Sequence, residues 1–295
     1  MTEYSTAAPT PFQRHLRTRR WFVSLLLAGI AVPAPVAAQG SYRNTDAARS
    51  TRVEDAYAIP RYAVDMYVSP IGIERDASGE LSWGGRPGLA YGLLPRTQVA
   101  VAVPLVSAVG GGGRRVGAAG VDLSILYNLN TETGGLPAFG LRASTLVPAG
   151  PAGPAALQSR LRGIATRTVA FGRVHVNGDY TWGGAPDGGR PSAAGSPLSP
   201  LTRWTAGVAL DHSFVRRALL ASVEAVASEP NPTRGRTEWA VGGSLRYQLD
   251  PSWVLDGGIG RRLAVDPAWY LTLGISRLVA VKALMPGRGA WAGGR

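Results

Sequence analysis

The sequence contains no cysteine, which excludes a disulfide framework and any thiolate metal site. Charge is also scarce: Asp, Glu, Lys and Arg make up 17% of the 295 residues, against roughly 25% in ordinary soluble domains. The charge that is present is unbalanced, with a net value of +12, and nearly every basic residue is arginine. Such a balance suggests nucleic acid as a partner, but the basic residues form no stripe, and a phosphate-bearing membrane surface fits them equally well.

Long apolar runs are missing as well. Beyond the N-terminal region no stretch approaches the 18 apolar residues that indicate a transmembrane helix. The mean hydropathy of +0.02 is too low for a bundle of such helices. Glycine (39) and proline (22) are frequent, yet they stay below the roughly 25–30% that is typical of disordered low complexity. The composition therefore leaves an all-β protein, either soluble or embedded in a membrane.

The N-terminus carries an export signal. Residues 14–20 include four arginines, the apolar run Trp21–Val32 follows, and small residues precede Gln39. This order is that of a secretory signal peptide, predicted at 1–38 with cleavage after Ala38, and its apolar core is too short to span a bilayer. The pair Arg19-Arg20 also resembles a twin-arginine signal, so the general secretory and twin-arginine routes both remain open.

Beyond Gln39 the hydrophobic pattern has a period of two. Val174 and Val176, for example, alternate with His175 and Asn177, which gives a strand one apolar and one polar face. About twelve such segments can be counted: 57–68, 86–94, 97–106, 118–129, 137–147, 162–170, 174–183, 202–212, 218–227, 236–249, 253–262 and 268–279. They predict a transmembrane antiparallel up-and-down β-barrel of about 12 strands (between 10 and 14) over residues 57–279. An N-terminal periplasmic segment, 39–56, precedes this barrel, and a flexible C-terminal tail, 280–295, follows it.

The connections alternate in length, as they do in bacterial outer-membrane barrels. Tight turns follow the second, sixth, eighth and tenth segments, whereas longer loops are predicted at 69–85, 107–117, 148–161 and 184–201. With the tight turns in the periplasm, aromatic residues gather at both ends of the strands, where amphipathic rings prefer the membrane–water interfaces. The predicted aromatic girdle consists of Tyr91, Tyr127, Trp182, Trp204, Trp239, Tyr247, Trp253 and Trp269. The alternative is that these are scattered core aromatics of a soluble sandwich.

A sheet in lipid must close, because lipid cannot satisfy an open edge, and closure turns the polar face inward. The predicted lumen-lining residues are Asp122, Arg142, His175, Asp179, Asp211, Glu224, Glu238, Arg246, Asp256 and Arg262. Their charges either tune the selectivity of a pore or merely pair across strands and neutralise one another. Arginines in predicted outer loops either bind lipopolysaccharide phosphates or are solvated: Arg114, Arg115, Arg190, Arg234 and Arg236.

Three stretches resemble the outer-membrane proteins grouped as the MetA-pathway-of-phenol-degradation family. They are Arg86–Leu93 with Val99–Pro104, Pro137–Arg142 with Pro148–Gly150, and Trp253–Gly260 with Asp266–Trp269 and Gly274. The resemblance spans most of residues 57–279 and rests on the spacing of glycine, proline and aromatic residues. It implies a barrel that passes small, often aromatic or hydrophobic, compounds, and it implies no binding residues. One departure is that barrels of this kind commonly end at an aromatic residue, whereas this chain continues past Val279.

The sequence gives little indication of a catalytic site. Asp211-His212-Ser213 contains the residue types of a hydrolase triad, but neighbours on a strand point to opposite faces, and no G-x-S-x-G motif is present. Three histidines and no cysteine offer no metal-ligand cluster, and no cofactor motif is found. We therefore expect no enzyme, no cofactor and no metal.

The sequence favours an outer-membrane channel of a Gram-negative-type cell that passes small, possibly aromatic or hydrophobic, molecules. One alternative is a structural or adhesive barrel with a plugged lumen, and a remote one is a barrel hydrolase that uses His175. The expected partners are outer-membrane lipid and lipopolysaccharide, the solute and the barrel-assembly machinery, for a monomer that binds no nucleic acid.

Overall fold

The computed structural model describes residues 51–75, 79, 81–110, 113–154, 156–183, 204–214, 218–229, 236–263 and 268–280. The predicted signal peptide, the 184–201 loop and the tail beyond Ala280 lie outside these residues. In the part of the chain that is described, no helix is long and apolar enough to cross a membrane.

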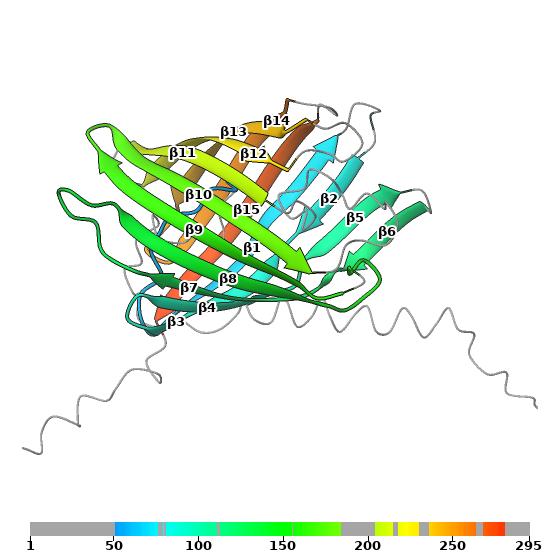
Figure 1. Ribbon diagram of the computed structural model, residues 1–295, viewed down its shortest axis with the longest axis horizontal. Coiled ribbons are helices and arrows are strands. Elements are labelled where there is room, and N and C mark those ends of the chain that lie inside the picture. Colours follow the sequence, from blue (N-terminus) through cyan, green and yellow to red (C-terminus); the bar gives the residue numbers. More distant parts are fainter. Residues whose placement is uncertain are drawn as a thin grey trace, which may run out of the picture. The chain divides into compact units, whose positions relative to one another are not determined.

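These residues form fifteen strands in one antiparallel sheet (Figure 1). The strands are β1 (Ala63–Arg75), β2 (Leu81–Gly85), β3 (Pro87–Leu94), β4 (Thr97–Ala102), β5 (Leu105–Gly110), β6 (Gly113–Ala118), β7 (Gly120–Asn128), β8 (Ala138–Pro148), β9 (Gln158–Val169), β10 (Gly172–Gly183), β11 (Trp204–Phe214), β12 (Leu219–Ser228), β13 (Glu238–Gln248), β14 (Trp253–Arg262) and β15 (Trp269–Ala280).

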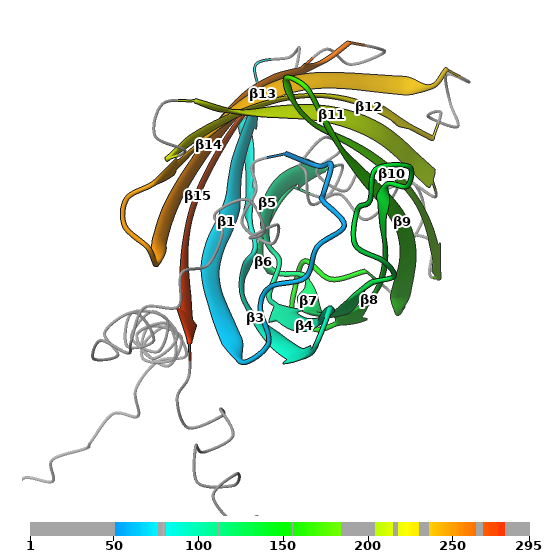
Figure 2. The same cartoon turned by 90° about the vertical axis from the view of Figure 1, so that its left-hand side faces the viewer.

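The sheet closes on itself, because β1 pairs with β15 along its whole length, from Ala63 opposite Ala280 to Arg75 opposite Trp269. The closed ring contains the twelve strands β1, β3, β4 and β7 to β15, and Figure 2 shows it nearly end-on. Each strand of the ring overlaps one of the segments found by periodicity, although β1 begins at Ala63 and extends to Arg75, so the predicted segment 57–68 is displaced towards the N-terminus. The prediction of a transmembrane antiparallel barrel of about 12 strands is confirmed.

The remaining strands, β2, β5 and β6, extend one side of the wall. β1 changes its neighbour from β3 to β2 beyond a register shift between Val68 and Ile71, after which β2 pairs with β5 and β5 with β6. The predictions of loops at 69–85 and 107–117 are therefore wrong in large part. A break near Arg86 separates β2 from β3, and a break near Pro104 separates β4 from β5. Because of these breaks, β2, β5 and β6 do not continue the alternating pattern by which the ring strands were predicted.

The direction of burial is that of a membrane barrel. Along β10, His175, Asn177 and Asp179 are buried, whereas Val176, Tyr180 and Trp182 are about half exposed. The same alternation gives the barrel a polar, charged interior and an exterior of exposed leucine, valine, isoleucine and aromatic side chains. A soluble barrel would bury its apolar face, so this arrangement is suited to lipid outside and polar contacts inside.

Candidate functional site

The lumen is occupied by the chain that precedes β1, residues 51–60, which we call the lumen segment. In Figure 2 this stretch, drawn in blue, lies inside the ring of strands. Its apolar side chains are buried at three places: Val53 against Ala209 and Val226, Ala56 against Leu126 and Ile164, and Ile59 in a third cluster. The expected periplasmic segment, 39–56, is described only from residue 51, and that part lies within the barrel.

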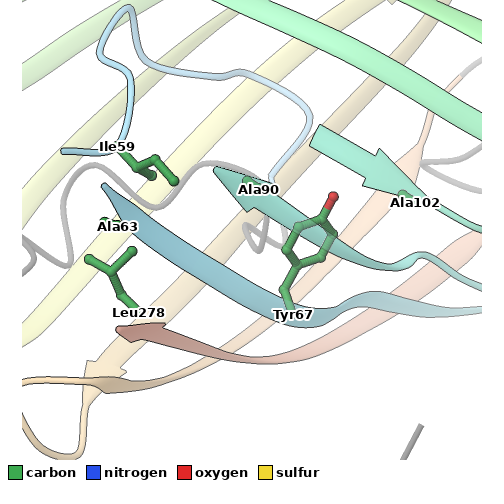
Figure 3. Packing of buried hydrophobic residues seen from close by; sticks show 6 residues of the cluster. All are labelled: Ile59, Ala63, Tyr67, Ala90, Ala102 and Leu278. Atoms are coloured by element: carbon green, nitrogen blue, oxygen red, sulfur yellow. The ribbon is translucent and has the colours of Figure 1, made fainter. Parts of the chain in front are cut away.

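The third cluster lies where the lumen segment meets the barrel wall. Figure 3 shows the six residues of this cluster: Ile59 of the lumen segment, Ala63 and Tyr67 of β1, Ala90 of β3, Ala102 of β4 and Leu278 of β15. All six residues are at most 4% exposed. This small apolar cluster ties the start of β1 to the seam at which the barrel closes.

Side chains of the wall bond the backbone of the lumen segment at several points. Glu224 accepts the N–H groups of Arg52 and Val53 at 2.8 and 3.1 Å. Further wall side chains bond the N–H groups of Glu54, Ala56 and Ile59 and the carbonyl groups of Glu54 and Ala56: Asn177, Thr166, Gln98 and Asn128. A buried backbone requires such partners, which explains why so many polar residues line the interior.

Two acidic residues of the lumen segment pair with arginines of the wall. Glu54 lies between Arg142 of β8 and Arg162 of β9, at 2.7 and 2.6 Å. Asp55 is fully buried and lies 3.3 Å from Arg173 of β10. The segment is therefore held by three kinds of interaction: apolar contacts, backbone hydrogen bonds and ion pairs.

Other interior charges pair across neighbouring strands. Arg246 of β13 faces Asp256 of β14 directly in register, at 2.9 Å. Arg162 and Asp179 form a second pair of this kind, at 2.7 Å. Further ion pairs of the interior, among the described residues, join Arg173 with Asp211, Arg86 with Asp122, Arg262 with Glu74, and Arg160 with Asp179.

His175 lies between two polar residues of the wall, one of which bonds the lumen segment. One ring nitrogen lies 3.0 Å from the Thr166 hydroxyl and the other 3.0 Å from Asp211, so these three residues have the order of a hydrolase triad. The Thr166 hydroxyl, however, already accepts the N–H of Ala56 and is fully buried. The arrangement holds the segment and presents no open nucleophile.

The sequence triplet at the end of β11 is divided between the two faces of the wall. Asp211 is buried in the interior with Arg173 and His175. His212 is exposed, and its ring packs edge-on against Phe214. The three neighbours therefore do not form a common site.

The structure places eight of the ten predicted lumen residues among the buried polar residues: Arg142, His175, Asp179, Asp211, Glu224, Arg246, Asp256 and Arg262. Asp122 and Glu238 are partly exposed. The aromatic girdle residues all face outward to some degree: Tyr127, Trp182, Trp239, Tyr247 and Trp269 are exposed, and Tyr91, Trp204 and Trp253 are half-buried. Their roles in selectivity and in membrane anchoring remain predictions.

Sequence reasoning missed Glu54, Asp55, Asp65, Arg162 and Arg173. The two acids of the lumen segment belong to no periodic pattern, so no signal could have found them. Arg173 stands two residues before His175 on the same strand face, and the period of two could have identified it. Within the described residues, no group of three or more histidine or acidic side chains is placed to hold a metal ion.

Fold and interior together define the class: a transmembrane β-barrel with its own N-terminal segment inside the lumen. No family model matches the sequence, and no curated protein matches it either.

Among solved structures, the chain is similar to the COG4313 outer membrane channel from Pseudomonas putida F1, with 17% identity and a TM-score of 0.49 over 76% of this chain and 98% of that one. It is similar to the KdgM porin, with 11% identity and a TM-score of 0.47 over 73% and 98%. A third similar structure is outer membrane phospholipase A from Escherichia coli, with 10% identity and a TM-score of 0.39 over 84% and 100%. Each of these similarities is distant and concerns the fold alone.

Proposed function

We propose that the protein is an outer-membrane β-barrel through which small molecules cross passively. The observation that carries this proposal is the direction of burial: a closed wall with an apolar exterior encloses buried arginines, acids and a histidine. A barrel that served only as a scaffold could fill its interior with apolar side chains, as small packed barrels do. A charged interior of this kind is typical of barrels that tune the passage of solutes.

The lumen segment is the gate in this proposal. It lies inside the ring, yet it adds no strand to the wall, and wall side chains hydrogen-bond its backbone. Its displacement would therefore leave the twelve-strand ring hydrogen-bonded and closed. A solute would cross when the segment moves aside or leaves room beside it.

The finer expectations belong to the same proposal. The resemblance to the MetA-pathway-of-phenol-degradation family suggests small aromatic or hydrophobic solutes. Export by a cleaved signal peptide, 1–38, would bring the chain to the outer membrane of a Gram-negative-type cell. There the assembly machinery would insert it as a monomer among lipid and lipopolysaccharide. Of the loop arginines considered for that lipid, Arg190 and Arg234 lie outside the described residues.

A second candidate function is a structural or adhesive barrel whose lumen stays plugged. The specific observation in its favour is the lumen segment itself, with Val53, Asp55 and Ala56 at most 1% exposed. The two candidates differ in whether the segment ever leaves, and this difference can be tested.

A disulfide that fixes the lumen segment distinguishes the two functions. A Cβ atom added at Gly140 of β8 would lie 3.0, 3.2 and 3.4 Å from the carbonyl oxygen, Cα and Cβ of Ala56, so a small outward shift of the lumen segment brings the two Cβ atoms to the 3.5–4.5 Å found across disulfides. Because the chain has no cysteine, Ala56→Cys with Gly140→Cys creates the only possible disulfide. In liposome swelling with a neutral pentose, we expect the reduced double variant to swell faster than the oxidised one.

Wild-type protein and the two single-cysteine variants serve as controls, and reductant should leave their swelling unchanged. Equal swelling of the oxidised and reduced double variant, above empty liposomes, would show that the segment is no gate. Absence of swelling for every variant would favour the plugged structural barrel.

A further inference from the structure

Arg142 of β8 and Arg162 of β9 stand directly opposite each other in the register of the two strands. Like charges in that position repel and destabilise a sheet. The carboxylate of Glu54 lies between them, with one oxygen 2.7 Å from Arg142 and the other 2.6 Å from Arg162. We call this pair of arginines the Arg142–Arg162 clamp. The clamp holds a carboxylate that comes from the lumen segment and not from the barrel wall.

The two arginines of the clamp differ in their partners on the barrel wall. Arg162 also binds Asp179 through two nitrogens, at 2.7 and 3.1 Å. Within the described part of the chain, the ion pair of Arg142 is the one with Glu54, and its contact with the wall is a long hydrogen bond of 3.5 Å to Ser124. Arg142 is 9% exposed. The barrel therefore carries a buried arginine whose counter-ion belongs to the lumen segment.

More positive charge surrounds the clamp. Arg86 pairs with Asp122, and Arg160 is within electrostatic range of both Arg86 and Arg162. The Arg160 side chain is 30% exposed; it bonds Thr181 through Nε and lies 3.7 Å from Asp179, and the described residues offer its two terminal nitrogens no hydrogen bond. Four guanidinium groups thus face three carboxylates, and only two carboxylates would remain if Glu54 left.

We propose that the Arg142–Arg162 clamp, with Arg160 beside it, is a binding site for the carboxylate group of acidic small molecules, and that Glu54 occupies this site until such a molecule replaces it. Replacement of Glu54 would also free the lumen segment to move and open the channel. That consequence rests on the channel function proposed above, whereas the binding site itself does not. Arginine is suited to this task because its planar fork of donors matches a carboxylate.

The exchange also explains what would hold the gate closed. Removing one partner of a buried ion pair leaves an uncompensated charge, which is strongly unfavourable. The lumen segment therefore leaves at a high cost when nothing replaces Glu54, and at a much lower cost when another carboxylate enters the clamp. A neutral solute of the same shape cannot compensate Arg142, so the site selects acids.

Benzoate and benzyl alcohol, which share a ring but differ in charge, test the site. Binding to purified protein in detergent is measured by titration calorimetry for the wild type and for Glu54→Ala. We expect Glu54→Ala to bind benzoate at least tenfold more tightly than the wild type, because its clamp is empty. Benzyl alcohol should bind both proteins alike. Adding Arg142→Gln to Glu54→Ala should remove the gain.

Asp250→Asn is the matched control, because it removes the charge of an exposed acid in the turn between β13 and β14, and it should leave benzoate binding unchanged. Folding of every variant is checked by heat-modifiable electrophoretic mobility. If Arg142→Gln does not fold, Arg142→Lys keeps the charge but loses the fork, and should hold benzoate less tightly in the Glu54→Ala protein.

Equal affinity of the wild type and Glu54→Ala for benzoate would overturn the proposal. An equal gain for benzyl alcohol would overturn it too, because the site would then recognise the ring and not the carboxylate. A benzoate gain in Glu54→Ala combined with a protein that never swells liposomes would support the binding site and reject the channel. The experiments therefore distinguish a failure of the binding-site proposal from a failure of the channel proposal.

Discussion

At the scale of single residues, the interior is organised by arginines and the acids that neutralise them. Arg246 and Asp256 are buried to 1% and 6% exposure and face each other across β13 and β14. Asp65 of β1 is fully buried, its carboxylate oxygens have no hydrogen-bond partner in the described structure, and Arg246 is the cation that acts on it. Arg246 therefore pairs directly with Asp256 and acts on Asp65 only through its charge.

Removing this arginine should be costly. We expect Arg246→Met to lower the free energy of unfolding by about 3–5 kcal/mol, because it leaves a buried carboxylate uncompensated. Urea unfolding of the barrel in lipid vesicles, followed by tryptophan fluorescence, measures the loss. The double variant with Asp256→Leu should recover much of it, since neither charge of the pair is then left alone. A double variant as unstable as the single one would contradict this explanation.

At the scale of strands and turns, the alternation of two faces decides what each residue contacts. Asp250, in the tight turn between β13 and β14, supports that turn by accepting hydrogen bonds from the N–H groups of Ser252 and Trp253 and from the Ser252 hydroxyl. The backbone hydrogen bonds from Ser252, then from Trp253, hold the pKa of the Asp250 carboxyl below its ordinary value. The folded protein therefore favours the ionised form of this side chain.

This turn should depend on pH in a defined direction. Because the pKa of Asp250 is lower in the folded state, its contribution to stability is present above the ordinary value of about 3.9 and is lost as the pH falls through the lowered value. We expect Asp250→Ala to destabilise the barrel at neutral pH by less than Arg246→Met does. Asp250→Asn keeps an acceptor but cannot titrate, so the difference between wild type and this variant should shrink in acid. A difference that stays constant with pH would exclude the role of ionisation.

At the scale of the whole molecule, closure between β1 and β15 creates an outside and an inside from the same two-faced strands. Val223, in the middle of β12, is 58% exposed, whereas its neighbours Ser222 and Glu224 are buried. Near the strand ends the exterior tolerates charge: Arg261 lies over the ring of Trp269 at 5.2 Å. The exterior is therefore apolar in the middle and amphipathic towards the rim.

An arginine in the apolar band should oppose folding in lipid. We expect Val223→Arg to lower the free energy of unfolding in vesicles by about 2–4 kcal/mol, the cost of a cation on the lipid-facing side near the midplane. Arg261→Leu, at the same face but near the rim, should change it much less. Equal stability of wild type and Val223→Arg would mean that this face does not meet lipid.

The sequence by itself determined the ring. Alternation such as Val174-His175-Val176-Asn177 fixes which side chains share a face, and short turns join neighbouring strands, so twelve strands and a transmembrane barrel follow from local rules. The same rules identified eight of the buried polar residues of the wall, among them Arg142, Asp211 and Arg246, because these residues stand on the polar face of their strands.

Only the tertiary structure decided what fills that ring. The lumen segment has no regular secondary structure, and its acids Glu54 and Asp55 reach arginines more than 80 positions away in the chain, a separation that no local pattern encodes. The extension of the wall by β2, β5 and β6 was likewise decided by pairing between strands, because β1 pairs with β2, β2 with β5, and β5 with β6. Periodicity specifies the face of a strand on which a charged side chain lies. The partner of that side chain inside the lumen depends on the three-dimensional arrangement of the strands and the lumen segment.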